Sequence, residues 1–312
     1  MRAVLLGGSG FIGRALTSRL LENDIHVVVT SRNPEHGRYL IPEGHSFHVD
    51  FALWDGKNPE QLATHIKAAD AVINLIGSNI SAGRWTEERK AEIRDSRISA
   101  GHALCKAVSI LEEKPRVVIQ SSAIGFYGSK PTSPEESYVT EDSPAGQGFL
   151  ASVCKEWEDS TACMDVSGTR RVIIRTGLVL GNGGVLQKFI PPFRFGAGGP
   201  LGSGKQVMSW IHIQDQVDAI IHIMKTPSCT GAINLTSPYP ETMNVFCKTL
   251  GAVMGKPSWL RVPAPVLRMA LGEMAEELIL QGQRVLPEKL LESGFCFSYP
   301  MLDEALANIL RR

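Results

Sequence analysis

Residues 3–13 read Ala-Val-Leu-Leu-Gly-Gly-Ser-Gly-Phe-Ile-Gly, an apolar run that stops abruptly at glycine and continues into an amphipathic segment. This order predicts a buried strand, a tight turn and a helix that packs back on the strand. Gly7, Gly10 and Gly13 let the turn bend, let a pyrophosphate approach the backbone and let the helix lie close to the sheet. We therefore expect a dinucleotide to bind at this first strand-to-helix turn.

The residues that open the predicted helix belong to the same expected site. Phe11 and Ile12 are expected to carry the first backbone N–H groups of the helix, which lie at the positive end of its dipole and face the phosphates. An ordinary strand-to-helix turn is the alternative, because a lone glycine triplet is a weak signal. The position of this triplet, after a strand and before a helix, favours the dinucleotide site.

The end of the predicted second strand, residues 25–32, indicates which dinucleotide binds. Enzymes that use NAD usually place Asp or Glu there, where the carboxylate holds the hydroxyls of the adenosine ribose. This chain has Ser31 followed by Arg32. A guanidinium can donate two hydrogen bonds to the oxygens of a 2′-phosphate, whereas an acid would repel that group. The sequence therefore favours NADP(H), with a solvent-facing arginine as the alternative interpretation.

Length and charge limit the class of protein. The chain has 312 residues and a formal net charge of zero, which suits one large or two modest domains and gives no electrostatic reason to expect nucleic acid or an anionic membrane as a partner. Its apolar runs are too short to cross a membrane, and its first residues are an expected strand and not a signal peptide. We expect a cytoplasmic protein with a small-molecule substrate; the oligomeric state stays open, with a homodimer as one alternative.

The cysteines indicate a reducing compartment. The six residues stand apart, without a Cys-x-x-Cys pair, at positions 105, 154, 163, 229, 247 and 296. We therefore expect small buried side chains, with neither a disulfide framework nor a metal site.

Apolar runs and amphipathic segments alternate along most of the chain. Strands are expected at residues 3–6, 25–32, 48–50, 70–77, 116–122 and 171–176. Such alternation is typical of an α/β, doubly wound parallel-sheet Rossmann fold. We assign residues 1–237 to this NADP-binding domain, with a Gly/Pro-rich loop at 178–210 on the substrate side. Residues 238–312 are expected to form a small, mainly helical C-terminal domain on the substrate side.

Two further segments are candidates for the cofactor site. The expected strand at 70–77 ends in Asn74-Leu75-Ile76-Gly77, and strand ends on this side of a parallel sheet line the ligand crevice. The expected helix at 85–113 carries Glu92 and Arg97, which are too far apart for a simple i,i+4 pair. At least one of them points into the crevice, or both lie on a solvated face.

These motifs together resemble a known family. The glycine turn, Asn74-Leu75-Ile76-Gly77, Ser121-Ser122-Ala123 and Trp210-Ile211-His212-Ile213-Gln214-Asp215 resemble the extended short-chain dehydrogenase/reductases, which include the sugar-nucleotide epimerases and dehydratases. Asp95-Ser96-Arg97-Ile98 and Ala123-Ile124-Gly125-Phe126-Tyr127-Gly128 narrow the resemblance to the atypical, epimerase-like branch with a distinct small C-terminal domain. The resemblance covers essentially the whole chain.

The resemblance implies an NADP(H)-binding fold and a role for each matching position. It places Ser31 and Arg32 at the 2′-phosphate, and it places Leu75 and Ile76, followed by Gly77, beside the adenosine. Arg97 is expected to face a ribose, and Glu92, on the same helix, is a second candidate on the cofactor side. Gly177 is expected to lie near the nicotinamide.

One departure from the family pattern concerns catalysis. The family's reaction depends on Tyr-x-x-x-Lys in the helix after the serine strand, where the lysine holds the nicotinamide ribose and lowers the pKa of the tyrosine. None of the five tyrosines here has Lys four residues on, and Leu150 or Ala151 occupies the expected tyrosine position. Lys155 lies close to the lysine position, but an offset of one residue turns a helical side chain by roughly 100°.

Two hypotheses of function follow. In the first, the protein is an NADP(H)-dependent oxidoreductase or epimerase acting on a small carbonyl or sugar-like compound. Ser122 then orients the substrate oxygen, Lys155 binds the nicotinamide ribose and Tyr127 replaces the missing proton donor. Tyr127 as a packing residue is the alternative, and His212 is either a second proton carrier or structural. In the second hypothesis, the protein binds NADP(H) without turnover, and its cofactor occupancy regulates a partner.

Overall fold

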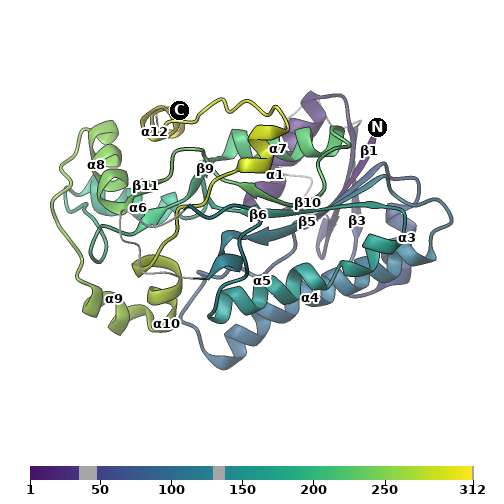
Figure 1. Ribbon diagram of the computed structural model, residues 1–312, viewed down its shortest axis with the longest axis horizontal. Helices are drawn as coiled ribbons and strands as arrows, with labels where there is room; N and C mark the ends of the chain where they lie inside the picture. Colours follow the sequence, from purple (N-terminus) through teal and green to yellow (C-terminus); the bar gives the residue numbers. More distant parts are fainter. Residues whose placement is uncertain (35–47, 129–137, 311–312) are drawn as a thin grey trace.

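The computed structural model describes residues 1–34, 48–128 and 138–310. The strands of the central sheet are β1 (Arg2–Leu6), β2 (His26–Ser31), β3 (Val49–Leu53), β4 (Ala71–Asn74), β5 (Val117–Ala123), β6 (Arg170–Thr176) and β10 (Gly231–Leu235). They are all parallel and lie in the order β10-β6-β5-β4-β1-β2-β3 (Figure 1). The strand order reverses at β1, which is where ligand crevices form in such sheets. The predicted doubly wound α/β fold is therefore confirmed.

The remaining elements connect or extend this sheet. The short strands β7 (Leu178–Leu180) and β9 (Trp210–His212) pair in parallel, and β8 (Val207–Met208) and β11 (Glu241–Thr242) pair antiparallel. The helices are α1 (Phe11–Glu22), α3 (Pro59–Ile66), α4 (Glu87–Ile110), η2 (Ile124–Tyr127), α5 (Phe149–Asp159), η3 (Ala162–Val166), α6 (Leu186–Arg194), α7 (Ile213–Lys225), α8 (Met243–Met254), α9 (Ala264–Leu271), α10 (Glu273–Ala275), η4 (Glu276–Leu280), α11 (Glu288–Glu292) and α12 (Leu302–Leu310).

Helices cover both faces of the sheet. Figure 1 shows α1 and α7 on one face and α3, α4 and α5 on the other. Strand β1 explains this arrangement, because successive side chains of a strand point to opposite faces. Ala3 and Leu5 belong to the core under α1 and α7, whereas Val4 and Leu6 belong to the core under α3 and α4. A strand buried on both faces requires the continuous apolar run that the sequence shows.

A third core forms where the predicted Gly/Pro-rich loop meets the C-terminal region. The segment predicted as a loop at 178–210 contains β7, α6 and β8, so this part of the prediction was wrong. In α6, Leu186, Ile190 and Phe193 follow helical spacing and are buried against α8 and α12. This packing outweighs the helix-breaking tendency of two internal prolines.

The C-terminal region also reaches back to the sheet. After α8 the chain runs through α9 and α10 toward the helices on the lower face (Figure 1). Met274 and Leu278 pack there with Trp85, before α4, and with Phe149 at the start of α5. We call residues 276–283, which follow α10, the covering segment. Among the described residues, no helix combines the length and apolar composition needed to cross a membrane.

Candidate functional site

The glycine turn after β1 has the geometry that close approach of a phosphate requires. Gly7 has a φ of +81°, a left-handed conformation that favours glycine. A Cβ on Gly13 would lie 2.6 Å from the Cα of Gly8, so α1 can pack against the turn only because residue 13 is glycine. Helix α1 starts with Gly10 as its N-cap and no side-chain cap. Its first N–H groups are therefore left for an anionic ligand.

The loop after β4 borders this turn. A Cβ on Gly7 would lie 3.1 Å from the backbone carbon of Leu75 and 3.2 Å from Ile76. On the other side of the loop, a Cβ on Gly77 would lie 2.8 Å from Cζ of Arg97. The structure thus brings the glycine turn, the β4 loop and Arg97 to one edge of the sheet.

Arg97 is a partly buried cation at this edge. Its guanidinium donates to the backbone oxygens of Ile93 and Ser78, at 2.7 and 3.1 Å, and its Cζ lies 4.9 Å from the ring centroid of Trp157. Burial lowers the pKa of Arg97 to about 10, and no carboxylate within the described residues raises it. A partly buried cation held by carbonyl oxygens suits a ligand with an anionic or electron-rich group.

The end of β2 and the start of α4 supply the other predicted contacts. The hydroxyl of Ser31 lies 3.1 Å from the backbone oxygen and nitrogen of Asn33, and Arg32 is exposed. Glu92 accepts a hydrogen bond from the hydroxyl of Ser78 at 2.9 Å and pairs with Arg89. These two donors, with the more distant charge of Arg32, hold the pKa of Glu92 below its ordinary value.

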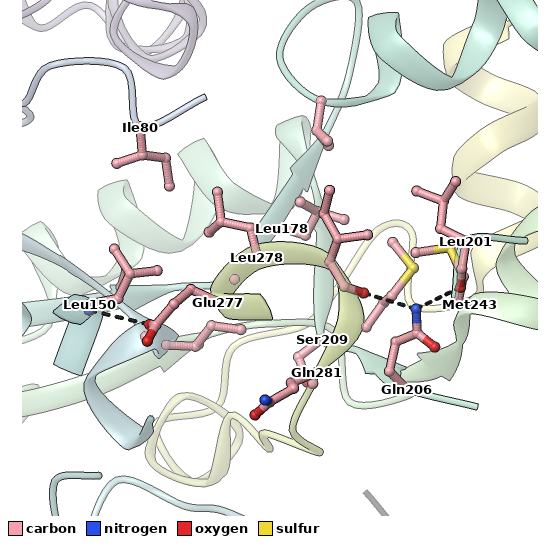
Figure 2. A pocket seen from close by; sticks show the side chains of 18 of the residues that line it. Ile80, Leu150, Leu178, Leu201, Gln206, Ser209, Met243, Glu277, Leu278 and Gln281 are labelled. Carbon is pink, nitrogen blue, oxygen red and sulfur yellow. Dashed lines mark hydrogen bonds between the residues drawn. The ribbon is translucent and has the colours of Figure 1, made fainter. Parts of the chain in front are cut away.

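A cavity of about 420 Å³ opens beside this edge, at the carboxyl ends of β5 and β6. Ala123 and Gly177, at the ends of these strands, line it, and so do Glu277 and Leu278 of the covering segment, which Figure 2 labels. The rest of the wall is largely apolar, and its polar side chains include Arg97, Thr176, Lys188, Gln206, Ser209, Glu277, Gln281 and Gln283. Gly177, which the resemblance places near the nicotinamide, is thus one of the residues that line this cavity.

The face of α5 toward the cavity is apolar. Leu150, Val153, Cys154 and Trp157 line the cavity at helical spacing. Lys155 is one position off this face and is exposed, so the prediction that it binds the nicotinamide ribose is not supported. Burial raises the pKa of the Cys154 thiol to about 11, so this group stays protonated at neutral pH. Leu150 and Cys154, four residues apart, are thus two of the four α5 side chains that line the cavity.

Ser122 and Tyr127 belong to a buried network and are not part of the cavity wall. Ser122 donates to Glu158 at 2.7 Å, and Glu158 pairs with Arg175 at 2.9 Å. The Tyr127 hydroxyl donates to Asn234 at 2.7 Å and accepts from Arg175 at 3.0 Å, and Tyr127 is 2% exposed. Desolvation raises the pKa of Tyr127 above its ordinary value. Both side chains make structural contacts and neither lines the cavity, so the roles predicted for them in substrate orientation and proton donation are not supported by this geometry.

His212 is structural as well. It is the N-cap of α7, where its Nδ1 accepts a hydrogen bond from the backbone N–H of Gln214 at 3.0 Å. Its ring lies 4.2 Å from the ring centroid of Tyr299, and it does not belong to the cavity wall. Of the predicted proton carriers, none in the described part of the chain lines the cavity.

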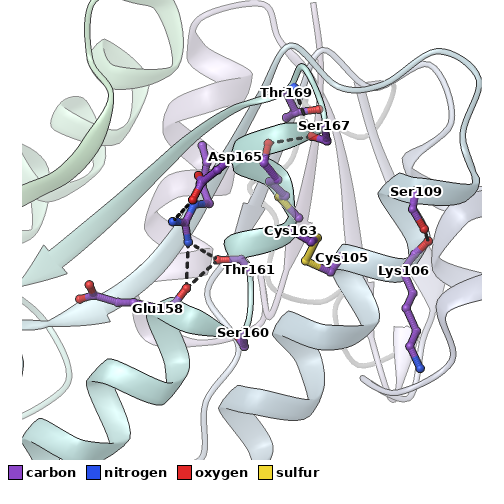
Figure 3. The surroundings of a disulfide bond; sticks show 12 residues. Cys105, Lys106, Ser109, Glu158, Ser160, Thr161, Cys163, Asp165, Ser167 and Thr169 are labelled. Atoms are coloured by element: carbon purple, nitrogen blue, oxygen red, sulfur yellow. Dashed lines mark hydrogen bonds and ion pairs between the residues drawn. A yellow bond between two sulfur atoms is a disulfide. The ribbon is translucent and has the colours of Figure 1, made fainter.

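The expectation of unpaired cysteines was wrong at one pair. Cys105, near the end of α4, and Cys163, in η3, form a disulfide with their Cα atoms 6.1 Å apart (Figure 3). The two residues are 58 positions apart, and the packing of η3 on α4 brings them together. Cys154, Cys229 and Cys247 are free and buried as expected, whereas Cys296 is free and exposed.

Comparison with known proteins places this geometry in a family. A model of the NAD dependent epimerase/dehydratase family matches residues 3–236. The chain belongs to this family. A second model, a domain of unknown function (DUF1731), matches residues 262–309. The resemblance to the atypical epimerase-like branch is thereby confirmed.

Relatives of this epimerase-family chain match it over its whole length. Epimerase family protein YfhF of Bacillus subtilis is 38% identical over 99% of this chain and 98% of its own. Epimerase family protein SDR39U1 of Homo sapiens is 33% identical over 99% and 100%. A crystal structure of human SDR39U1 (isoform2) with NADPH has a TM-score of 0.88 and 32% identity, and covers 100% of both chains. The UDP-glucose 4-epimerase of Thermotoga maritima, with UDP-glucose, has a TM-score of 0.79 at 18% identity, which shows the fold alone.

Several residues of the cavity in this epimerase-family protein gave no signal in the sequence. Glu277 accepts hydrogen bonds from the backbone N–H groups of Phe149 and Leu150, both at 3.3 Å, and so caps α5, which has no side-chain cap of its own. Gln283 donates to the backbone oxygen of Ile124 at 2.7 Å. Both residues come from a segment more than 120 positions away from their partners, so no local motif could indicate them.

Proposed function

We propose that this protein is an NADP(H)-dependent oxidoreductase that acts on a small carbonyl compound. The observation that carries the proposal is the cavity of about 420 Å³ that begins at Gly177 and Ala123 and is closed by the covering segment. Pockets of this kind at the carboxyl ends of parallel strands are the usual substrate sites of such folds.

The residues present fit the dinucleotide. The uncapped N-terminus of α1 and the glycine at position 7 would hold the pyrophosphate, and Arg32 would hold the 2′-phosphate. Human SDR39U1, which matches the whole chain, was solved with NADPH, and this supports the choice of NADP(H). When bound, the reduced nicotinamide supplies a hydride to a carbonyl carbon, the carbonyl oxygen takes a proton, and the alcohol and the oxidised nicotinamide are the products.

The proton has no obvious protein donor in this cavity. Cys154 stays protonated with a pKa of about 11, and Arg97 holds its protons. Lys188 is exposed and donates to the backbone oxygen of Ser81 at 2.8 Å. Both oxygens of Glu277 accept from α5. We therefore assign the proton to water, so turnover lacks the roughly 10²–10⁴-fold gain that a tuned acid provides.

Turnover with a panel of carbonyl compounds, measured as loss of NADPH absorbance, tests the proposal. Leu150→Trp fills the cavity beside α5 and should abolish turnover, whereas Lys155→Ala, on the exposed face of the same helix, should leave turnover unchanged. Thermal unfolding of both variants controls for stability. Absence of NADPH consumption across the panel, in a protein shown to bind NADPH, would reject the oxidoreductase.

A second candidate function rests on a specific observation. Ser122, Tyr127 and Lys155 do not line the cavity, and the side chains that α5 contributes to its wall include no tyrosine or lysine. Both facts favour a protein that binds NADP(H) without turnover. In that case NADPH should slow hydrogen exchange in the covering segment, although no carbonyl compound is consumed. Unchanged exchange in that segment on NADPH binding would argue against a regulatory role.

A further inference from the structure

We infer that the ligand of the cavity is a carbonyl compound with a hydrocarbon body, and not a sugar nucleotide. The carbonyl group of this ligand rests on the proposed function, and its hydrocarbon body is inferred from the side chains that line the cavity. It names the class of compound that the wall can hold.

The wall opposite the sheet edge is built of apolar side chains from four separate parts of the chain. Val185 and Phe189 come from the α6 region, Met208 from β8, Val262 from the loop before α9, and Leu278 and Ile279 from the covering segment. Figure 2 shows Leu278 of this wall together with Ile80, Leu178 and Leu201 around the same space. Apolar surface contributed by each of these elements favours a ligand that is itself apolar along most of its length.

The polar side chains of the wall are largely engaged by the protein itself. Gln206 donates to the backbone oxygens of Leu201 and Ile279 at 2.9 and 2.8 Å (Figure 2). Ser209 donates to the backbone oxygen of Gln283 at 2.7 Å. Hydroxyls of a sugar would therefore lose their bonds to water without finding replacements, and a buried group without a partner weakens binding.

Charge also argues against a nucleoside diphosphate in this space. Of the two cations in the wall, Arg97 lies at the glycine-turn edge and Lys188 is exposed and engaged with Ser81. A diphosphate enclosed among the apolar side chains would have no counter-charge beside it.

Two fully buried polar atoms of lining residues are available to a small head group. Nε1 of Trp157 and Oε1 of Gln283 are buried without a hydrogen-bond partner among the described residues, and both residues line the cavity. One donor and one acceptor suit a carbonyl oxygen and the hydroxyl of the alcohol product. They are too few for a sugar.

The apolar wall continues to the molecular surface. Leu260 lines the cavity and is 42% exposed, and its neighbour Trp259 is 67% exposed. Nε1 of Trp259 donates to the backbone oxygen of Gly196 at 3.0 Å, and Phe195, the preceding residue, is also exposed. A hydrocarbon chain could thus contact apolar side chains at the surface before it enters the cavity.

Calorimetric titration of a series of unbranched methyl ketones into the NADPH-loaded protein tests the inference. Affinity should rise about four-fold for each added methylene, until the cavity is full. UDP-glucose, titrated in the same way, should not bind. A flat dependence on chain length, or tight binding of UDP-glucose, overturns the inference.

A matched pair of variants locates the effect, and a second readout separates the two proposals. Leu278→Gln should weaken the longest ketone about ten-fold and leave NADPH affinity unchanged, whereas Leu278→Met should bind like the wild type. If both variants bind the longest ketone with equal affinity, the apolar wall at Leu278 does not bind the hydrocarbon body. Ketones that bind with the expected chain-length dependence but consume no NADPH reject the oxidoreductase and leave the ligand class standing. Turnover of short polar carbonyl compounds, with no dependence of affinity on chain length, rejects the hydrocarbon ligand and leaves the oxidoreductase standing.

Discussion

Replacing Tyr127 by phenylalanine tests whether this residue is structural or catalytic. Its hydroxyl donates to Oδ1 of Asn234 at 2.7 Å and accepts from Nη1 of Arg175 at 3.0 Å. Phenylalanine keeps the ring, which packs edge-on against Phe126 with the centroids 5.4 Å apart. The substitution therefore removes two buried hydrogen bonds and little else.

The magnitude follows from the partners that are left behind. Nη1 of Arg175 retains the backbone oxygen of Glu141 at 3.1 Å, so the guanidinium loses one of two acceptors at that nitrogen. Oδ1 of Asn234 loses its donor and becomes a buried acceptor without a partner. An unsatisfied buried acceptor and a lost bond to a charged group each cost about 1–3 kcal/mol, and relaxation offsets part of the sum. We expect Tyr127→Phe to lower the free energy of unfolding by about 2–4 kcal/mol.

Urea unfolding followed by circular dichroism measures this loss, and the midpoint should fall while the slope of the transition stays the same. Tyr138→Phe is the matched control, because Tyr138 is largely exposed, and it should change stability by less than about 0.5 kcal/mol. NADPH affinity and turnover should be unchanged in both variants, since Tyr127 does not line the cavity.

The opposite pattern would refute the assignment. If Tyr127→Phe keeps its stability and loses turnover by roughly 10²–10⁴-fold, the phenol donates a proton and the buried network does not describe the working protein.

Three further predictions concern the cofactor site and the disulfide. Arg32→Ala should weaken NADPH by roughly 1.5–3 kcal/mol in a calorimetric titration and leave NADH nearly unaffected; equal losses for both would remove Arg32 from the 2′-phosphate. Gly10→Val should stay folded, because a Cβ there meets its nearest atom, the Gly7 oxygen, at 3.4 Å, but should lose most of its NADPH affinity; unchanged binding would mean that the phosphate lies elsewhere. Reduction with dithiothreitol should lower the free energy of unfolding by about 2–4 kcal/mol in the wild type and have no effect on Cys105→Ser/Cys163→Ser; equal responses would show that the disulfide contributes nothing.

The local parts of the fold could be predicted from the sequence because their signals lie between near neighbours. The apolar run of β1 indicates burial on both faces, and Ala3 and Leu5 do face one core while Val4 and Leu6 face the other. The glycine turn, the start of α1 and the parallel sheet follow from the same short stretch and its repetition along the chain.

The catalytic candidates depended on which way a side chain points, and adjacent residues differ in this. At the end of β5, Ser122 bonds to Glu158 in the buried network, whereas Ala123, the next residue, lines the cavity. On α5, one position separates the exposed Lys155 from Cys154 in the cavity wall. The sequence thus indicated two segments that do border the cavity, but not which of their side chains line it.

The glycine turn, the alternation of strands and helices and the missing Tyr-x-x-x-Lys pair were determined by the sequence alone, because each depends on residues a few positions apart. The disulfide of Cys105 and Cys163, the buried network around Arg175 and the cap that Glu277 places on α5 were decided by the tertiary structure. Their partners are separated by long stretches of chain, and nothing short of the packing of whole helices and strands brings them within bonding distance.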